Sequence, residues 1–184
     1  MSCVTYRANI EMLALIEAIL DILLRRRGPE ALPDSAFLTQ LLLVAYVACQ
    51  VPTAVVVYGW SAMAAQFVAL DAVMYTGFFC LLLRFTGNGD RLRQTLAALY
   101  GTGAVLGLAQ LPLLLASRSA ASPAERPVLL SFALLAFLVW MVTVWAHIGA
   151  RALSRSLVTG MVVALAYSVI SFQVSTQLSP QVPG

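Results

Sequence analysis

The sequence predicts an all-α fold: a polytopic transmembrane bundle of five helices preceded by an amphipathic N-terminal helix. Composition gives the first reason, because 61% of the 184 residues are apolar and only 10% are charged. A soluble domain is about 45–50% apolar and about 25% charged. Mean hydropathy is the second reason, at +0.89. Since about 20 apolar residues cross a bilayer as a helix, the length allows five spans and leaves no room for a separate soluble domain.

The N-terminal helix is predicted over Arg7–Arg27, within a cytoplasmic segment that covers residues 1–33. At 100° per residue its charged side chains fall within one sector of roughly 120°. They are Arg7, Glu11, Glu17, Asp21 and Arg25. Three acids make a solitary transmembrane helix a poor interpretation, so we expect this helix to dock either on lipid or on a partner. Arg25, Arg26 and Arg27 are the candidates for contact with lipid phosphates or with that partner.

Charge spacing within the same helix predicts two ion pairs. Arg7 precedes Glu11 by four residues, and Asp21 precedes Arg25 by four residues, which places each pair on one side of a helix. A glycine and two prolines follow, and they are expected to end the helix.

Five apolar stretches form the predicted transmembrane domain over residues 34–176. They are Ala36–Tyr58, Ser61–Leu83, Gln94–Ala116, Val128–Ile148 and Ala152–Ser175. Only Gly59 and Trp60 separate the first two stretches, so these form a tight antiparallel hairpin. Residues 177–184 are left as a short external tail.

The distribution of arginine predicts the orientation in the membrane. With the N-terminus in the cytoplasm, nine of the eleven arginines lie on the cytoplasmic side and two lie outside. Positive side chains are retained in the cytoplasm, so we expect an N-terminus inside and a C-terminus outside.

Asp71 lies near the middle of the second span and is the only acid within the five stretches. An ionised carboxylate at that depth costs roughly 2.5–3.5 kcal/mol. No arginine shares its depth, and the candidate neighbours are Tyr46, Gln50 and Tyr167, with Tyr75 one turn away on the same helix. Such partners favour the neutral carboxyl. Asp71 is therefore either a proton-carrying or substrate-binding acid, or a structural hydrogen-bonding group that fixes the register of two helices.

A GxxxG motif in the third span consists of Gly103 and Gly107. Small residues at this spacing allow helix backbones to approach closely. The predicted contact is either with another helix of the same chain or with a second copy of the chain.

Residue patterns typical of catalysis or metal binding are missing from the sequence. His147 is the only histidine, and Cys3, Cys49 and Cys80 show no paired or metal-ligand spacing. We therefore expect no metal, no cofactor and no enzymatic activity. The net charge of +3 is explained by loop arginines, so no nucleic-acid partner is expected. Membrane lipids and either a protein partner or a homo-oligomer are the predicted contacts.

Two segments resemble bacterial Yip1-domain proteins. Gly87–Leu115 (GNGDRLRQTLAALYGTGAVLGLAQLPLLL) is similar to the central stretch of that family, and Leu138–Ile170 is similar to its last helical hairpin. Five spans with the N-terminus inside are also the family plan. The Asp-Leu-Tyr-Gly-Pro-type motif of eukaryotic members is missing, so their role with small GTPases is not carried over. The resemblance implies an integral membrane adaptor or organiser without catalytic residues.

Taken together, these observations predict a multi-pass protein of the bacterial inner membrane. Its expected role is non-enzymatic interaction or membrane organisation of the Yip1-like type. The alternative is a small transporter or an ion or proton pathway that uses Asp71.

Overall fold

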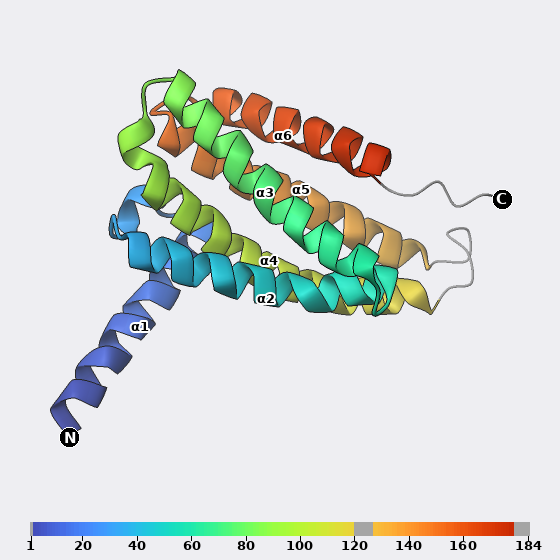
Figure 1. Cartoon of the computed structure of the whole chain (residues 1–184), viewed down its shortest axis with the longest axis horizontal. Coiled ribbons are helices and arrows are strands. Elements are labelled where there is room, and N and C mark those ends of the chain that lie inside the picture. The colour runs from blue at the N-terminus through green and yellow to red at the C-terminus, as the bar shows by residue number, and fades with distance from the viewer. Residues whose placement is uncertain (1, 120–126, 179–184) are drawn as a thin grey trace.

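In the described part of the chain, five long helices form a bundle and a further helix leaves it at one end (Figure 1). The computed structural model describes residues 2–119 and 127–178, with side chains from 12 to 119 and from 127 to 177. In chain order the elements are α1 (Ser2–Leu23), the 3₁₀ turn η1 (Pro29–Ala31), α2 (Ala36–Tyr58), α3 (Ala62–Phe85), the 3₁₀ turn η2 (Gly89–Arg91), α4 (Leu92–Arg118), α5 (Val128–Ala152) and α6 (Leu157–Leu178). The predicted all-α class is confirmed.

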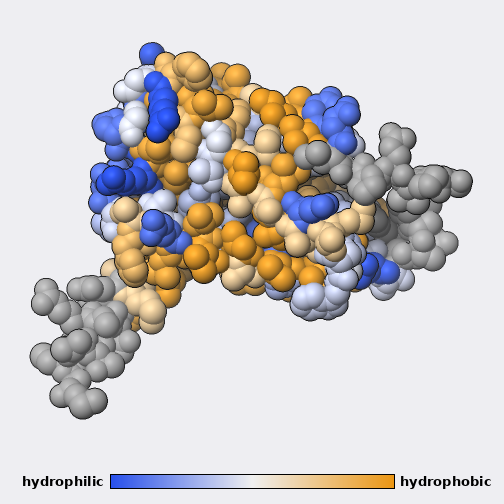
Figure 2. Space-filling model, in the orientation of Figure 1, coloured by the Kyte–Doolittle hydropathy of each residue, from blue (hydrophilic) through white to orange (hydrophobic). Residues whose placement is uncertain are grey.

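Helices α2 to α6 are each long and apolar enough to cross a membrane. The five candidate spans cover Ala36–Tyr58, Ala62–Phe85, Gly89–Arg118, Val128–Ala152 and Leu157–Gln177. Each has at least the roughly 20 residues that a bilayer core requires. Figure 2 shows hydrophobic residues over the middle of the bundle and hydrophilic residues gathered at its ends. The described chain is thus a helical membrane protein with five candidate spans.

The boundaries of four spans differ from the predicted ones, most of all at the turn between α5 and α6. Ala152 was expected to begin the last span, but it ends α5 instead. The chain reverses over the next residues, where Ser154 takes a positive φ of 51°. Ser156 then accepts a hydrogen bond from the backbone N–H of Thr159, as a helix N-cap does. The predicted fourth span ends at Ile148, and no residue near Gly149 predicts that α5 continues to Ala152.

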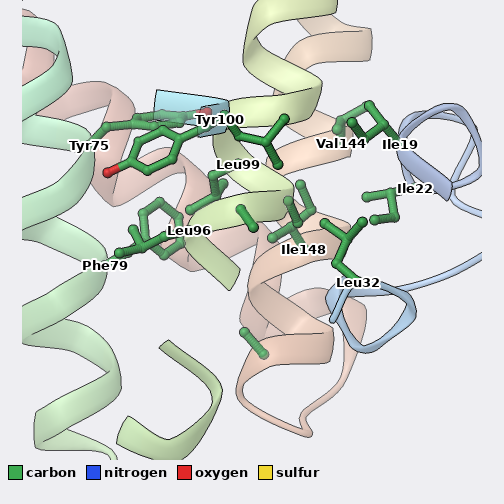
Figure 3. Close-up of a cluster of buried hydrophobic side chains, with 14 of the residues drawn as sticks. Ile19, Ile22, Leu32, Tyr75, Phe79, Leu96, Leu99, Tyr100, Val144 and Ile148 are labelled. Atoms are coloured by element: carbon green, nitrogen blue, oxygen red, sulfur yellow. The ribbon is translucent and has the colours of Figure 1, made fainter. Parts of the chain in front are cut away.

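Helix α4 lies at the centre of the bundle and packs on α1, α2, α3 and α5. Its buried stretch runs from Thr95 to Ala104 and continues at Leu106 and Gly107. Small residues fill much of this stretch, and they allow close approach of the surrounding helices. Figure 3 shows the result, with Tyr75 and Phe79 of α3 on one side of α4 and Ile19 and Ile22 of α1 on the other.

The second half of α1 is part of the core. Ala18, Ile19, Ile22 and Leu23 are buried. A Cβ added at Gly101 of α4 would lie 2.9 Å from the Cδ1 of Ile19, so this glycine makes room for α1. The N-terminal helix is therefore packed on the bundle at its base and projects from it farther out (Figure 1).

The predicted ion pair between Asp21 and Arg25 is wrong, because α1 ends before Arg25. The helix ends at Leu23, because Arg25 takes a left-handed conformation with φ of 60°. The chain then folds back, so the Asp21 carboxylate lies 3.2 Å from Arg27 and 3.9 Å from Arg26. The other predicted pair, Arg7 with Glu11, lies outside the described side chains.

Hydrogen bonds and ion pairs hold the segment after α1 against the bundle. The Nε2 of His147 donates to the carbonyl of Arg27 at 2.9 Å. The side-chain amide of Gln94 donates to the carbonyl of Leu32 at 3.0 Å. An ion pair joins Glu30 to Arg151. His147 thus connects α5 to the N-terminal segment. From residue 179 on, the predicted tail lies outside the described residues.

Candidate functional site

The Asp71 side chain lies midway along α3 and is half-buried between helices. The phenol of Tyr46 on α2 donates a hydrogen bond to its Oδ2. The amide of Gln50, one turn farther along α2, donates to the Tyr46 hydroxyl at 3.2 Å. An amide, a phenol and a carboxyl therefore form one hydrogen-bonded chain, and the described side chains place no ion pair on Asp71.

The two glycines of the GxxxG motif lie against the α2 side chains of this hydrogen-bonded chain. A Cβ on Gly103 would lie 2.7 Å from the Tyr46 ring, and a Cβ on Gly107 would lie 2.6 Å from the Oε1 of Gln50. Both distances are shorter than real Cβ contacts allow, so any larger residue would push these side chains away. In this structure the two glycines let α4 pack closely on α2 of the same chain, and they leave room for the side chains of Tyr46 and Gln50.

Aromatic rings surround the carboxyl on its inner side. The Tyr46 ring stacks on that of Tyr75, with centroids 5.7 Å apart and planes within 4°. Tyr75, Trp145 and Tyr167 meet edge to face, at centroid distances of 5.1, 5.3 and 5.7 Å. Such pairs contribute about 0.5–1.5 kcal/mol beyond the area that they bury. The cluster joins α2, α3, α5 and α6 at the depth of Asp71.

A groove of about 470 Å³ leads from Asp71 toward the end of the bundle away from α1. Helices α3 and α6 separate toward that end, and α5 lies behind them (Figure 1). Besides Asp71 and Tyr167, the lining includes Trp145, two methionines and several hydroxyl groups. Its volume lies within the roughly 300–1,000 Å³ of small-molecule sites. The structure thus brings together Asp71, Gln50 and Tyr167, the three predicted intramembrane residues, beside an open groove.

The serine side chains of the groove come from α6 and are not among the residues predicted from the sequence. Ser168, Ser171 and Ser175 all line the groove. Their spacing of three and four residues puts them on one face of a helix, and this pattern could have been noticed in the fifth span. Ser168 donates to the carbonyl of Ala164 at 2.8 Å.

Three buried polar groups of the aromatic cluster have no hydrogen-bond partner among the described residues. They are the hydroxyls of Tyr75 and Tyr167 and the indole N–H of Trp145. Buried polar groups are nearly always paired with protein or water. A site with a carboxyl, unpaired donors and an open groove can therefore accept water or a polar ligand at mid-bundle depth.

The remaining predicted contacts lie at the other end of the molecule. Arg25, Arg26 and Arg27 are exposed where the chain turns after α1. The described residues hold no group of three or more potential metal ligands. Comparison of the chain with protein-family models, curated proteins and solved structures finds no match.

Proposed function

We propose that the chain is a non-enzymatic integral membrane interaction protein, adaptor-like as the resemblance to Yip1-domain proteins implies, and that α1 is its interaction element. One observation supports this proposal above all. Large apolar side chains of α1 and of the residue that follows it are between 42% and 64% exposed, namely Met12, Leu13, Ile16 and Leu20 on the helix and Leu24 directly after it. They form a stripe on the side of α1 that the bundle leaves open.

The stripe has the geometry of a helix-binding surface. Met12, Ile16 and Leu20 recur every four residues, so they follow one side of the helix, and Leu24 comes directly after the helix ends. The helix projects from the bundle (Figure 1), and the side chains of this stripe are exposed from Met12 to Leu20. Full burial of one such side chain contributes about 1.5–3 kcal/mol. We infer that the partner is a protein helix with an apolar face.

The proposal includes the orientation of the protein in the membrane, with the α1 end of the bundle on the cytoplasmic side. The α1 end of the bundle holds Arg84, Arg91 and Arg93 near the turn before α4, and Arg151 and Arg155 near the turn before α6. Arg118 lies at the opposite end. The positive-inside tendency supports a cytoplasmic α1 in the bacterial inner membrane, with exposed arginines near lipid phosphates. In cells whose native cysteines are replaced by serine, an impermeant maleimide should label Ser119→Cys and leave Asn88→Cys unlabelled.

The experiment that tests the α1 proposal uses the double variant Ile16→Ser, Leu20→Ser. The intact protein is extracted in native-lipid particles and weighed as a complex by mass spectrometry. We expect a stoichiometric partner, which the double variant loses while its five spans stay inserted. Glu17→Gln is the matched control on the same helix and should keep the partner. A wild-type chain without a partner, or a double variant that keeps it, would overturn the proposal.

A second candidate function is a proton or small-solute pathway through Asp71. The observation in its favour is the groove, which connects the mid-bundle carboxyl to one end of the molecule. Protein reconstituted in vesicles with an internal pH dye should pass protons or solute, and Asp71→Asn should stop the flux. Asp90→Asn, which changes an exposed acid outside the groove, should leave it unchanged. Equal flux in Asp71→Asn would exclude this pathway.

A further inference from the structure

The lining of the groove combines three kinds of side chain that suit one class of ligand. Asp71 supplies a single acid at the inner end. Trp145 and Tyr167 supply aromatic rings around it, and Tyr58 and Phe67 add two more toward the mouth. The described side chains place no cationic group in this lining.

Aromatic rings beside a carboxyl attract positive charge. A cation within about 6 Å of a ring centroid gains about 0.5–1 kcal/mol at exposed sites and about 2 or more when desolvated, with Trp the best ring. Two methionines, Met74 and Met141, also line the groove. Methionine is flexible and polarisable, so it adapts to apolar ligands of varied shape.

We propose that this groove is a binding site for a hydrophobic organic cation, whose charge lies beside Asp71 and whose apolar body lies against the aromatic and methionine side chains. This site is separate from the interaction role of α1, and it gives the second candidate function a ligand. Only transport of the cation rests on that second function, because binding at equilibrium requires no flux through the protein. The ligand class is a quaternary ammonium or phosphonium ion with apolar substituents.

Binding of the cation is coupled to release of a proton. With neutral partners only, Asp71 is held in the protonated form, since a buried charge without a counter-ion is costly. When the cation binds, the O–H bond of the carboxyl breaks, the proton leaves to bulk water, and the carboxylate becomes the counter-ion. One proton is released for each cation bound, so the net charge of the site does not change.

This exchange makes binding weaker at acidic pH. The groups that face Asp71 are the Tyr46 phenol and Gln50 amide of α2, Tyr75 on α3 itself, the Trp145 indole of α5 and the Tyr167 phenol of α6. Phenol, amide and indole groups carry no charge at acidic or neutral pH. Asp71 is therefore the group whose protonation competes with the cation.

The experiment compares two probes of nearly the same shape and opposite charge on the full chain in detergent. Tetraphenylphosphonium should bind and release one proton per molecule bound, which a dye reports in weakly buffered solution. Tetraphenylborate should bind at least about tenfold more weakly, a difference of about 1.4 kcal/mol. Equal binding of both ions to the wild-type chain would show an apolar groove that accepts any lipid-like molecule, and would overturn the proposal.

Three variants extend the test to the carboxyl itself. Asp71→Asn should lose both tetraphenylphosphonium binding and proton release. Asp71→Glu keeps a carboxyl and should retain both, and Asp90→Asn should behave as the wild type. Undiminished binding in Asp71→Asn would also overturn the proposal. If Asp71→Asn does not fold, the comparison of the two probes on the wild-type chain decides. If tetraphenylphosphonium binds but vesicles show no flux, the binding site at Asp71 is supported and the proton or solute pathway is excluded.

Discussion

Tyr46 belongs both to the hydrogen-bonded chain at Asp71 and to the aromatic cluster of the candidate site. Its hydroxyl donates to Asp71 and accepts from Gln50, and its ring stacks on Tyr75 and packs on Tyr100. A hydrogen bond and a packing contact are thus combined in one side chain. This makes it possible to separate the two contributions by substitution.

Tyr46→Phe removes the hydroxyl and keeps the ring. We expect the free energy of unfolding to fall by about 0.5–1.5 kcal/mol, because Asp71 loses a donor and the Gln50 amide loses an acceptor. Thermal unfolding in detergent, followed by circular dichroism, measures this. Tyr58→Phe is the matched control, since its ring also packs on a neighbour, Phe67, and it should unfold as the wild type does.

Gly103→Ala tests the close approach of α4 and α2 at the same place. The added methyl group would lie 2.7 Å from the Tyr46 ring, so we expect a loss of about 1–3 kcal/mol from overpacking. Gly77→Ala is the control, because a Cβ there meets nothing within 4 Å. Alanine favours a helix by up to about 1 kcal/mol over glycine, so Gly77→Ala should be neutral or stabilising. Equal stability of the two variants would contradict the packing described for Gly103.

At the scale of elements, the α5–α6 hairpin depends on a backbone contact. A Cβ on Gly160 of α6 would collide with the carbonyl oxygen of Ala146 on α5. A backbone oxygen cannot rotate away as a side chain can, so a larger residue at Gly160 would force α5 and α6 apart. This explains why small residues occur at the crossing of these helices, and why the groove wall formed by α6 has a fixed position.

Gly160→Ala should therefore loosen α6 as a whole. We expect faster hydrogen–deuterium exchange along the α6 backbone, because separation from α5 lowers the free energy of local opening. Gly149→Ala changes the facing helix at a position where a Cβ would lie 3.5 Å from Val163, an ordinary contact. That control should leave exchange in α6 unchanged, and similar exchange in both variants would contradict the role given to Gly160.

For the whole molecule, the contacts between the N-terminal segment and the bundle determine how firmly α1 is held. Gln94→Ala removes the donor to the Leu32 carbonyl. We expect trypsin to cleave after Arg25, Arg26 or Arg27 about five-fold faster, because a loss of about 1 kcal/mol increases local opening by that factor. Gln66→Ala, an exposed position on α3, is the control. Unchanged cleavage in Gln94→Ala would mean that this bond does not hold the segment.

Much of this fold could be predicted from the sequence, and the reasons lie in particular residues. Hydropathy located the five spans because lipid requires about 20 apolar residues for each crossing, and α2 has the predicted ends. The neighbours of Asp71 could be named from depth alone. The groove could not be predicted, because it results from the divergence of α3 and α6, and the left-handed conformation at Arg25 depends on packing that no local pattern shows.

The position of α4 has a consequence for how the protein is made. Helices emerge from the ribosome in chain order, yet α1 and α2 pack on α4, which is the fourth α-helix in the described sequence. Until residue 118 has been synthesised, the faces that these helices turn toward α4 have no partner in their own chain. The nascent protein therefore passes through a stage in which the insertion machinery, or lipid, covers those faces. A quality-control protease that recognises unassembled helices would find its substrate at that stage.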